Sequence, residues 1–158
     1  MNSRTYSQSS LQKSLTKTPE LFSEKSWNFL ISSEDLAIRW RHRYFNVEHT
    51  LQTLFSPKYS DQYSKFFSED EYTILDHLED FLSKIPSSKS ENIFIGEDLE
   101  CVLDEASKIK LLYRSDFIEI EHILLAISQD KRIGQKIFGI SNFNKPLLEE
   151  SFKVNNQK

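Results

Sequence analysis

The sequence of 158 residues is poor in the residues that build several common kinds of site. It contains one cysteine, Cys101, so an internal disulfide is excluded and a reducing compartment is favoured. It contains three glycines, and none of them lies in the Gly-x-x-x-x-Gly-Lys-Ser/Thr pattern of a phosphate-binding loop. We therefore expect this chain to have no ATPase activity and no nucleotide cofactor.

An excess of positive charge and long apolar runs are also missing. The net charge of -4 provides no general attraction for nucleic acids or for anionic membranes. No apolar run reaches the roughly 18 residues of a membrane span, and the first twenty residues lack the hydrophobic centre of a signal peptide. We expect a cytoplasmic protein without nucleic-acid or membrane partners. The alternative is the plastid stroma, because residues 1–20 are rich in serine and poor in acids, as transit peptides are.

The most informative pattern is an internal repeat. Val47-Glu48-His49-x-Leu recurs 73 residues later as Ile120-Glu121-His122-x-Leu. At the same offset, the apolar positions of residues 22–40 match those of residues 95–113, and both sets have the spacing of an amphipathic helix. A repeat of this length is typical of a duplicated structural unit rather than of a catalytic motif.

The fold class predicted from this pattern is all-α, with eight helices in two pseudo-symmetric repeats of four. After each long helix we expect three shorter ones: about 47–55, 60–67 and 70–84, then about 120–129, 131–138 and 143–153. The predicted organisation is a disordered tail over 1–20, repeat one over 22–86, a linker over 87–94 and repeat two over 95–155.

The doubled Glu-His pair has a structural interpretation and two chemical ones. Asn46 is expected to cap the second helix, which places Glu48 in the first turn near the positive end of the helix dipole. The first chemical interpretation is a zinc site. Such a site needs three or four convergent donors, and no His-x-x-x-His or Cys-x-x-Cys accompanies His49 or His122. We interpret both histidines as buried and hydrogen-bonded, Cys101 as a packing or peripheral thiol, and expect no metal cofactor.

The second chemical interpretation is a small stand-alone enzyme that uses each Glu-His pair for acid-base catalysis. Adjacent residues on a helix point about 100° apart, so Glu48 with His49, or Glu121 with His122, would not converge on one substrate atom. We keep this function as the alternative to a binding protein.

Four features of the sequence belong together: Phe-Ser-Glu-Lys-Ser-Trp at 22–27, the long helix ending in Arg-His-Arg-Tyr, the doubled Glu-His motif, and "QDKRIGQKIF" at 129–138. Together they resemble the Clp amino-terminal domain. This double Clp repeat precedes the ATPase rings of ClpB-type disaggregases and ClpC-type unfoldases, and the resemblance covers about residues 21–155. The chain also resembles free-standing Clp-repeat accessory proteins. The resemblance implies a non-catalytic module that recruits unfolded or aggregated clients or adaptors, or docks on Clp ATPase or protease subunits.

The resemblance also implies two acidic pockets, each where the start of a long helix meets the start of a Glu-His helix. Carried onto this sequence, they pair Ser23 with Glu48 and Gly96 with Glu121. In ClpC-type members these pockets bind the guanidinium of phosphorylated arginine. Most of the family's phosphate-binding hydroxyls are missing here, so it is open whether the glutamates bind a ligand or only stabilise helix starts.

The ends of the long helices depart from the family in a second way. The residue that follows each helix is usually a glycine in a left-handed turn, and here it is Arg41 and Arg114. The cluster "RWRHRY" at 39–44 interleaves basic and aromatic residues, as nucleic-acid sites do. Because the chain is acidic and we expect Trp40 and Tyr44 in the core, we do not interpret the cluster as such a site.

The first long helix also has apolar residues that the repeat does not require. Trp27, Ile31 and Ile38 lie within about 40° of one another on a helical wheel, away from the core stripe. We call them the ridge. One interpretation is a hydrophobic partner site; the other is that the tail or residues 56–69 cover the ridge.

Overall fold

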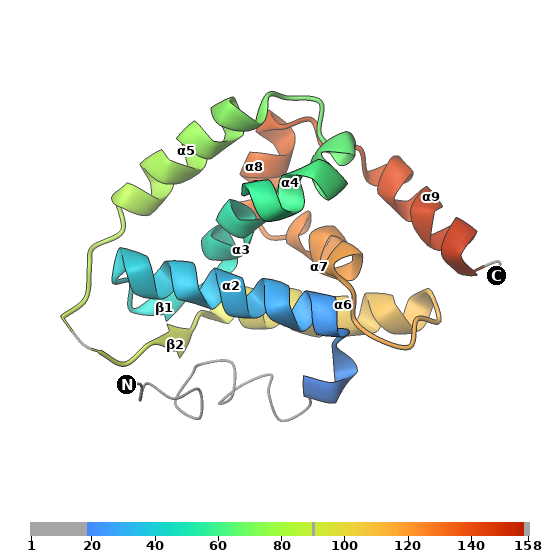
Figure 1. Ribbon diagram of the computed structural model, residues 1–158, viewed down its shortest axis with the longest axis horizontal. Coiled ribbons are helices and arrows are strands. Elements are labelled where there is room, and N and C mark those ends of the chain that lie inside the picture. The colour runs from blue at the N-terminus through green and yellow to red at the C-terminus, as the bar shows by residue number, and fades with distance from the viewer. Residues whose placement is uncertain (1–18, 90, 157–158) are drawn as a thin grey trace.

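The computed structural model describes residues 19–89 and 91–156, and within these ranges it has eight α-helices and one two-stranded sheet (Figure 1). The elements of the first half are η3 (Pro19–Leu21), α2 (Glu24–Trp40), β1 (Tyr44–Phe45), α3 (Val47–Leu54), α4 (Pro57–Tyr63), η4 (Ser64–Phe66) and α5 (Glu71–Ser83). Those of the second half are β2 (Phe94–Ile95), α6 (Glu97–Leu112), α7 (Ile120–Ile127), α8 (Gly134–Ile140) and α9 (Lys145–Asn156). The predicted all-α fold of eight helices is confirmed, and most of the predicted tail lies outside the described residues.

The helices form layers around the two short Glu-His helices. In Figure 1, α3 and α7 lie between the long helices α2 and α6 below and the outer helices α4, α5, α8 and α9. Each long helix packs mainly on the Glu-His helix of its own repeat, α2 on α3 and α6 on α7. Apolar side chains of both repeats form one continuous core, which includes Phe29, Leu51, Leu103 and Leu124. In the described part of the chain, no helix is long and apolar enough to cross a membrane.

Both long helices end in the left-handed turn that the resemblance to the Clp amino-terminal domain implies. Arg41 has φ 63° and Arg114 has φ 56°, and these two positions are 73 residues apart. The amide of His42 donates to the carbonyl of Ala37, and the amide of Ser115 donates to that of Lys110, both at 3.0 Å. These bonds satisfy carbonyls at each helix end, so the turn is kept although arginine is disfavoured there.

The two halves are joined by short crossed pairings of the segments before the helices. β1 pairs in parallel with β2, which sets Phe45 opposite Ile95. Phe22 pairs in parallel with Ile118, and these positions are the equivalents of Ile95 and Phe45 at the offset of 73. The segment before each long helix therefore pairs with the segment before the Glu-His helix of the other repeat.

One core prediction is wrong. Trp40 is half-buried and packs against the core, but Tyr44 is 51% exposed. Neighbouring residues of a strand point to opposite faces, so burial of Phe45 in β1 turns Tyr44 outward, where the Arg43 guanidinium lies 5.9 Å from its ring centre.

Candidate functional site

The crossed pairing determines which helix starts meet. The Ser23 amide donates to the Ile118 carbonyl at 3.2 Å, and the Ser26 hydroxyl donates to the same carbonyl at 2.6 Å. The equivalent Gly96 amide donates to the Phe45 carbonyl at 2.7 Å. The start of α2 thus lies beside the start of α7, and the start of α6 lies beside the start of α3.

The predicted pairing of the pocket residues is therefore wrong. The structure brings Ser23 to the Glu121 helix and Gly96 to the Glu48 helix. The reason is that α3 runs back along its own long helix, so that the start of α3 lies at the end of α2. There His49 Nε2 lies 2.8 Å from Nδ1 of His42, just beyond the end of α2. The 17 residues of α2, about 25 Å of helix, separate Ser23 from that end.

A residue from the first repeat caps the long helix of the second. At α2, the Ser23 hydroxyl accepts the Ser26 amide at 3.1 Å, as an N-cap side chain does. Gly96 has no side chain for the equivalent role at α6, and Asn46 Oδ1 accepts the Leu99 amide at 3.0 Å instead. A β-carbon on Gly96 would lie 2.3 Å from Asn46 Nδ2, so this close approach requires glycine.

Both motif histidines are buried capping residues. His49 Nδ1 accepts the Asn46 amide at 3.0 Å, and His122 Nδ1 accepts the Glu119 amide at 2.8 Å, which closes a capping box at each helix start. Burial, and secondarily nearby positive charge, lowers the pKa of His49 to about 3 and that of His122 to about 4. Hydrogen-bonded, buried histidines were predicted and are confirmed; the sequence analysis did not recognise the capping box.

At the pocket that was predicted beside Glu48, an arginine of the same chain contacts the carboxylate. The Arg132 guanidinium forms an ion pair with Glu48, and its Nε lies 2.6 Å from Asp98 Oδ2 in the first turn of α6. Burial raises the pKa of Glu48, and the charge of Arg132 opposes that rise. Glu48 is thus a buried carboxylate that is already paired.

Beside Glu121 the structure has an open cavity of about 260 Å³. Its lining combines carboxylates, aromatic rings and one lysine: Lys25, Tyr63, Tyr113, Ser115, Glu119, Glu121, His122 and Phe152. The rings of Tyr113 and His122 both pack against Phe152, with centroids 4.5 and 4.9 Å apart. The cavity therefore has an aromatic wall next to two acidic side chains.

The electrostatics of this cavity favour a positively charged group. Burial raises the pKa of Glu121, the neighbouring Glu119 raises it further, and Lys25 and Lys65 partly offset the rise. Burial and the same two carboxylates raise the pKa of the Tyr63 phenol. A ligand ammonium or guanidinium would relieve the repulsion between the carboxylates and could lie against the aromatic faces.

The ridge is half-buried rather than fully exposed. Trp27 and Ile31 pack against the core, and the Trp27 ring lies 5.4 Å from that of Phe22. The segment 56–69 packs on another face of α2, where Phe29 meets Tyr59 edge to face at 5.3 Å. Because Phe29 lies roughly 160–180° around the helix from the ridge residues, this segment does not cover the ridge through that contact.

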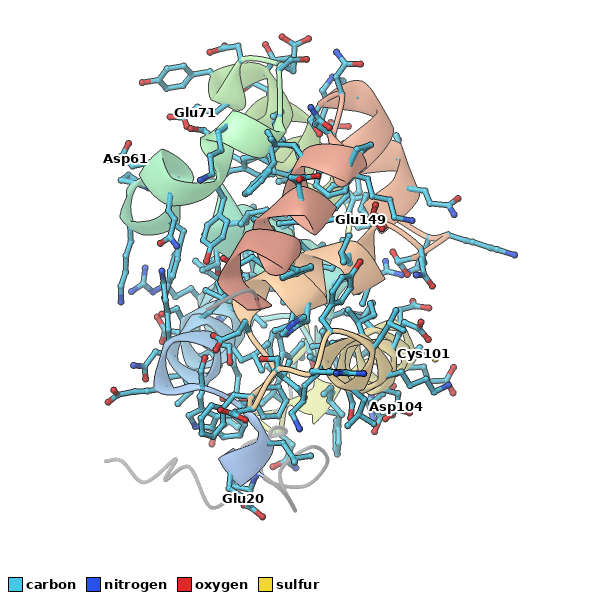
Figure 2. All side chains as sticks on the ribbon, turned by 90° about the vertical axis from the view of Figure 1, so that its right-hand side faces the viewer. Glu20, Asp61, Glu71, Cys101, Asp104 and Glu149 are labelled. Atoms are coloured by element: carbon cyan, nitrogen blue, oxygen red, sulfur yellow. The ribbon has the colours of Figure 1, made fainter. Side chains whose placement is uncertain are left out.

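The most exposed leucines lie elsewhere. Leu111 and Leu112, at the end of α6, are 69% and 74% exposed. Cys101 is exposed with its thiol free, and Figure 2 shows it with Asp104 on the outward side of α6. Among the described residues, no three His, Cys, Asp or Glu side chains are grouped so as to hold a metal ion.

Sequence reasoning missed most of the residues that line the Glu121 cavity or pair with Glu48, among them Lys25, Tyr63, Arg132 and Phe152. Tyr63, Arg132 and Phe152 come from α4, the α7–α8 connection and α9. No local pattern marks them, because their positions depend on how distant elements pack.

Comparison with known proteins agrees with this fold. Residues 21–139 match the family model of the Clp repeat (R) N-terminal domain. The chain belongs to this family.

Its relatives are Clp chaperones. It is 34% identical over 136 residues to chaperone protein ClpB 2 of Parasynechococcus marenigrum, which covers 86% of this chain and 15% of that protein. It is 29% identical over 126 residues to chaperone protein ClpB2, chloroplastic, of rice (Oryza sativa subsp. japonica), covering 77% of this chain and 13% of that protein. This chain thus spans only about one seventh of the length of these relatives.

A solved structure has the same fold. The N-terminal domain of Hsp104 from Candida albicans superposes with a TM-score of 0.70 at 20% identity, over 83% of this chain and 88% of that domain. At this identity the likeness shows that the helices are arranged in the same way, and it does not extend to what individual residues bind.

Proposed function

We propose that this chain is a non-catalytic protein-binding module of a Clp chaperone or protease system, which recruits unfolded clients or adaptors or docks on a Clp ATPase or protease subunit. Its family membership and its likeness to chaperone amino-terminal regions support this function. The relatives include a bacterial protein and one named chloroplastic, so the cytoplasm and the plastid stroma are both compatible with the proposal.

The observation that carries the proposal is the open cavity beside Glu121. It is acidic, lined with aromatic rings and accessible, so it can receive a basic side chain of a polypeptide. The Glu48 pocket differs because Arg132 already occupies it. We therefore propose Glu121, with Ser23 at the adjacent start of α2, as the accessible pocket site in this chain.

We expect the ridge to contribute more to partner binding than the pocket glutamates. The ridge residues Trp27, Ile31 and Ile38 can bury on the order of a hundred Å² or more, and at ~25 cal/mol per Å² this gives a gross gain of a few kcal/mol. The Glu121 cavity offers one charge-assisted contact, roughly 1.5–3 kcal/mol gross, which salt weakens, whereas the Glu48 carboxylate is already paired with Arg132. Binding that depends on the ridge should therefore survive moderate salt.

The test compares two double variants with wild type. Trp27→Ala with Ile38→Ser removes most of the ridge, and Glu48→Gln with Glu121→Gln removes both pocket charges. Binding of a fluorescently labelled, permanently unfolded protein is measured by anisotropy at low and moderate salt. We expect the ridge variant to lose at least about tenfold in affinity, and the pocket variant to lose less and mainly at low salt.

A matched control changes exposed apolar residues of another face. Leu111→Ser with Leu112→Ser removes two leucines of the second repeat without touching the core. If this control weakens binding as much as the ridge variant, the effect reflects general hydrophobicity. If the carboxylate variant abolishes binding and the ridge variant does not, the pocket is the main site. Binding by none of the four proteins, wild type included, would contradict the proposed function.

The alternative enzymatic function has little support in the geometry of the histidines. His49 Nδ1 accepts an amide hydrogen, so Nε2 carries the proton and donates to His42 at 2.8 Å. Both ring nitrogens are thus engaged, and its low pKa makes His49 a weak base at neutral pH. A hydrolase screen in which His49→Ala removed activity from a folded protein would favour the enzyme.

A further inference from the structure

The connection between α2 and α3 exposes basic side chains beside aromatic rings. Arg41, Arg43 and Tyr44 are all exposed. The guanidinium carbon of Arg43 lies 5.9 Å from the ring centre of Tyr44 and 5.6 Å from that of Phe94, and the two rings are 6.4 Å apart. Cation–π attraction holds a guanidinium beside such rings, and its N–H groups can still donate to an anionic acceptor.

The segment before α6 adds a third cation to this surface. The Ser88 amide donates to the Arg41 carbonyl at 2.7 Å, and the Phe94 amide donates to the Arg43 carbonyl at 2.9 Å. The two segments therefore run side by side into β1 and β2 (Figure 1), and they bring the exposed Lys89 to the same region. We call Arg41, Arg43 and Lys89 the basic patch. Backbone groups make these bonds, so they do not depend on the basic side chains.

The charges of the basic patch are not neutralised within the described part of the chain. No carboxylate there forms an ion pair with any of its three residues, whereas the neighbouring basic residues Arg39 and Lys84 each pair at 3.0 Å with an aspartate one turn earlier. Residues 84–95 contain one acidic residue, Glu91, and residues 1–18 contain none. We therefore look for the matching anionic groups on a partner.

The equivalent turn of the second repeat lacks this combination. Arg114 corresponds to Arg41 and has the same left-handed backbone, but the residue that corresponds to Arg43 is Asp116. The left-handed conformation is common to both turns and does not mark a site by itself. Two arginines with aromatic rings occur only at the turn of the first repeat, so the second turn provides a matched control.

We propose that the basic patch binds carboxylates of an acidic segment of a partner polypeptide, with Tyr44 as an adjoining apolar contact. Arginine N–H groups match carboxylate oxygens, and three unpaired cations suffice for a short acidic segment. A nucleic acid presents a long row of phosphates, which three cations on a chain of net charge -4 match poorly. The inference rests on the proposed protein-binding function for the nature of the partner, but it uses no residue of the ridge or of the Glu121 cavity.

The experiment titrates the protein with a fluorescein-labelled oligoglutamate peptide and follows anisotropy at low and moderate salt. A glycine-serine peptide and an oligothymidylate of equal length are the comparison probes. Arg41→Gly and Arg43→Gln each remove one charge of the basic patch. Arg114→Gly is the matched control, because it makes the same substitution at the equivalent left-handed turn.

We expect wild type to bind oligoglutamate more tightly than oligothymidylate, not to bind the glycine-serine peptide, and to lose affinity at moderate salt. Arg41→Gly and Arg43→Gln should each lose about fivefold or more in affinity, and Arg114→Gly should stay within about twofold of wild type. Arg41→Gly should melt no lower than wild type, because glycine adopts the left-handed conformation without strain. Its loss of binding would therefore not result from unfolding.

Three results would overturn the proposal: no binding of oligoglutamate at low salt, an equal loss in Arg114→Gly, or tighter binding of oligothymidylate through the same two arginines. The last result would make the basic patch a nucleic-acid site. The ridge variant, Trp27→Ala with Ile38→Ser, should bind oligoglutamate as wild type does. If oligoglutamate binds while the unfolded protein does not, the proposed function fails and the basic patch stands; the reverse contradicts the basic patch alone.

Discussion

Asn46 Oδ1 accepts the amide of Leu99 at 3.0 Å, so a residue of the first repeat caps a helix of the second. The same oxygen accepts the amide of Val47 at 2.9 Å, at the start of its own helix. One side chain thus serves the starts of α3 and α6, and the absence of a side chain at Gly96 leaves room for it.

Loss of this amide should destabilise the protein. Asn46→Ala removes both contacts, and we expect the free energy of unfolding to fall by about 1–2 kcal/mol in urea denaturation. Asn46→Ser, whose hydroxyl can cap α3 but is too short to reach Leu99, should lose an intermediate amount. An alanine variant within about 0.5 kcal/mol of wild type would show that the shared cap contributes little.

Replacing the left-handed arginines with glycine should stabilise the fold. At Arg41 and Arg114, φ values of 63° and 56° are disfavoured for a residue with a β-carbon, so each Arg→Gly variant should gain roughly 1 kcal/mol. Asn142, with φ 55°, is the matched control, because asparagine tolerates this conformation and Asn142→Gly should gain less. Thermal and urea denaturation measure the change; destabilisation in both arginine variants would contradict the strain argument.

His122 should make stability depend on pH between its folded and unfolded pKa values. Its folded pKa is about 4 and its ordinary value is 6.5, so between these values the unfolded chain binds more protons. Stability from this residue is present above pH 6.5 and falls as the pH drops toward 4, by about 1.4 kcal/mol per unit.

The variant His122→Gln isolates this effect, because glutamine can still accept the N-cap amide but does not titrate. The stability of the variant relative to wild type should rise as the pH is lowered from 6.5 to 4. Glu48 and Glu121, whose pKa values are raised, change the stability in the opposite direction just above pH 4.5. Because wild type and the variant both contain these glutamates, their contribution largely cancels in the comparison. A difference that does not change with pH would mean that His122 titrates normally in the fold.

The two repeats should unfold together. Phe67 of the first repeat packs against Phe138 and Phe143 of the second, each at 5.2 Å between ring centres, and the Ser68 amide donates to Ser141 at 3.1 Å. Separating the halves would expose this apolar surface, so we expect a single calorimetric transition with equal calorimetric and van't Hoff enthalpies. Two well-separated transitions would show that the repeats are independent.

Helix existence was predictable wherever one face of the helix is apolar. The predicted 47–55 and 70–84 agree closely with α3 and α5, whereas the predicted 60–67 begins three residues after α4 starts at Pro57. The error arises because the apolar residues of 59–67 serve both α4 and the 3-10 turn η4, so no single period covers them. Tyr44 was misassigned for a related reason, since a two-residue strand is too short to show its alternation.

The sequence by itself determined the duplication, the eight helices and the Asn46 cap, because helix periods and caps depend on residues close along the chain. The left-handed turns at Arg41 and Arg114 were expected only from the resemblance to the Clp amino-terminal domain. Only the tertiary structure decided that Glu121 lies with the start of α2 and Glu48 with the start of α6. It also decided that Arg132 occupies one pocket while the other is open. The physical reason is that parallel pairing of the segments before the helices crosses between repeats, and a periodic pattern carries no information about which copy a segment will meet.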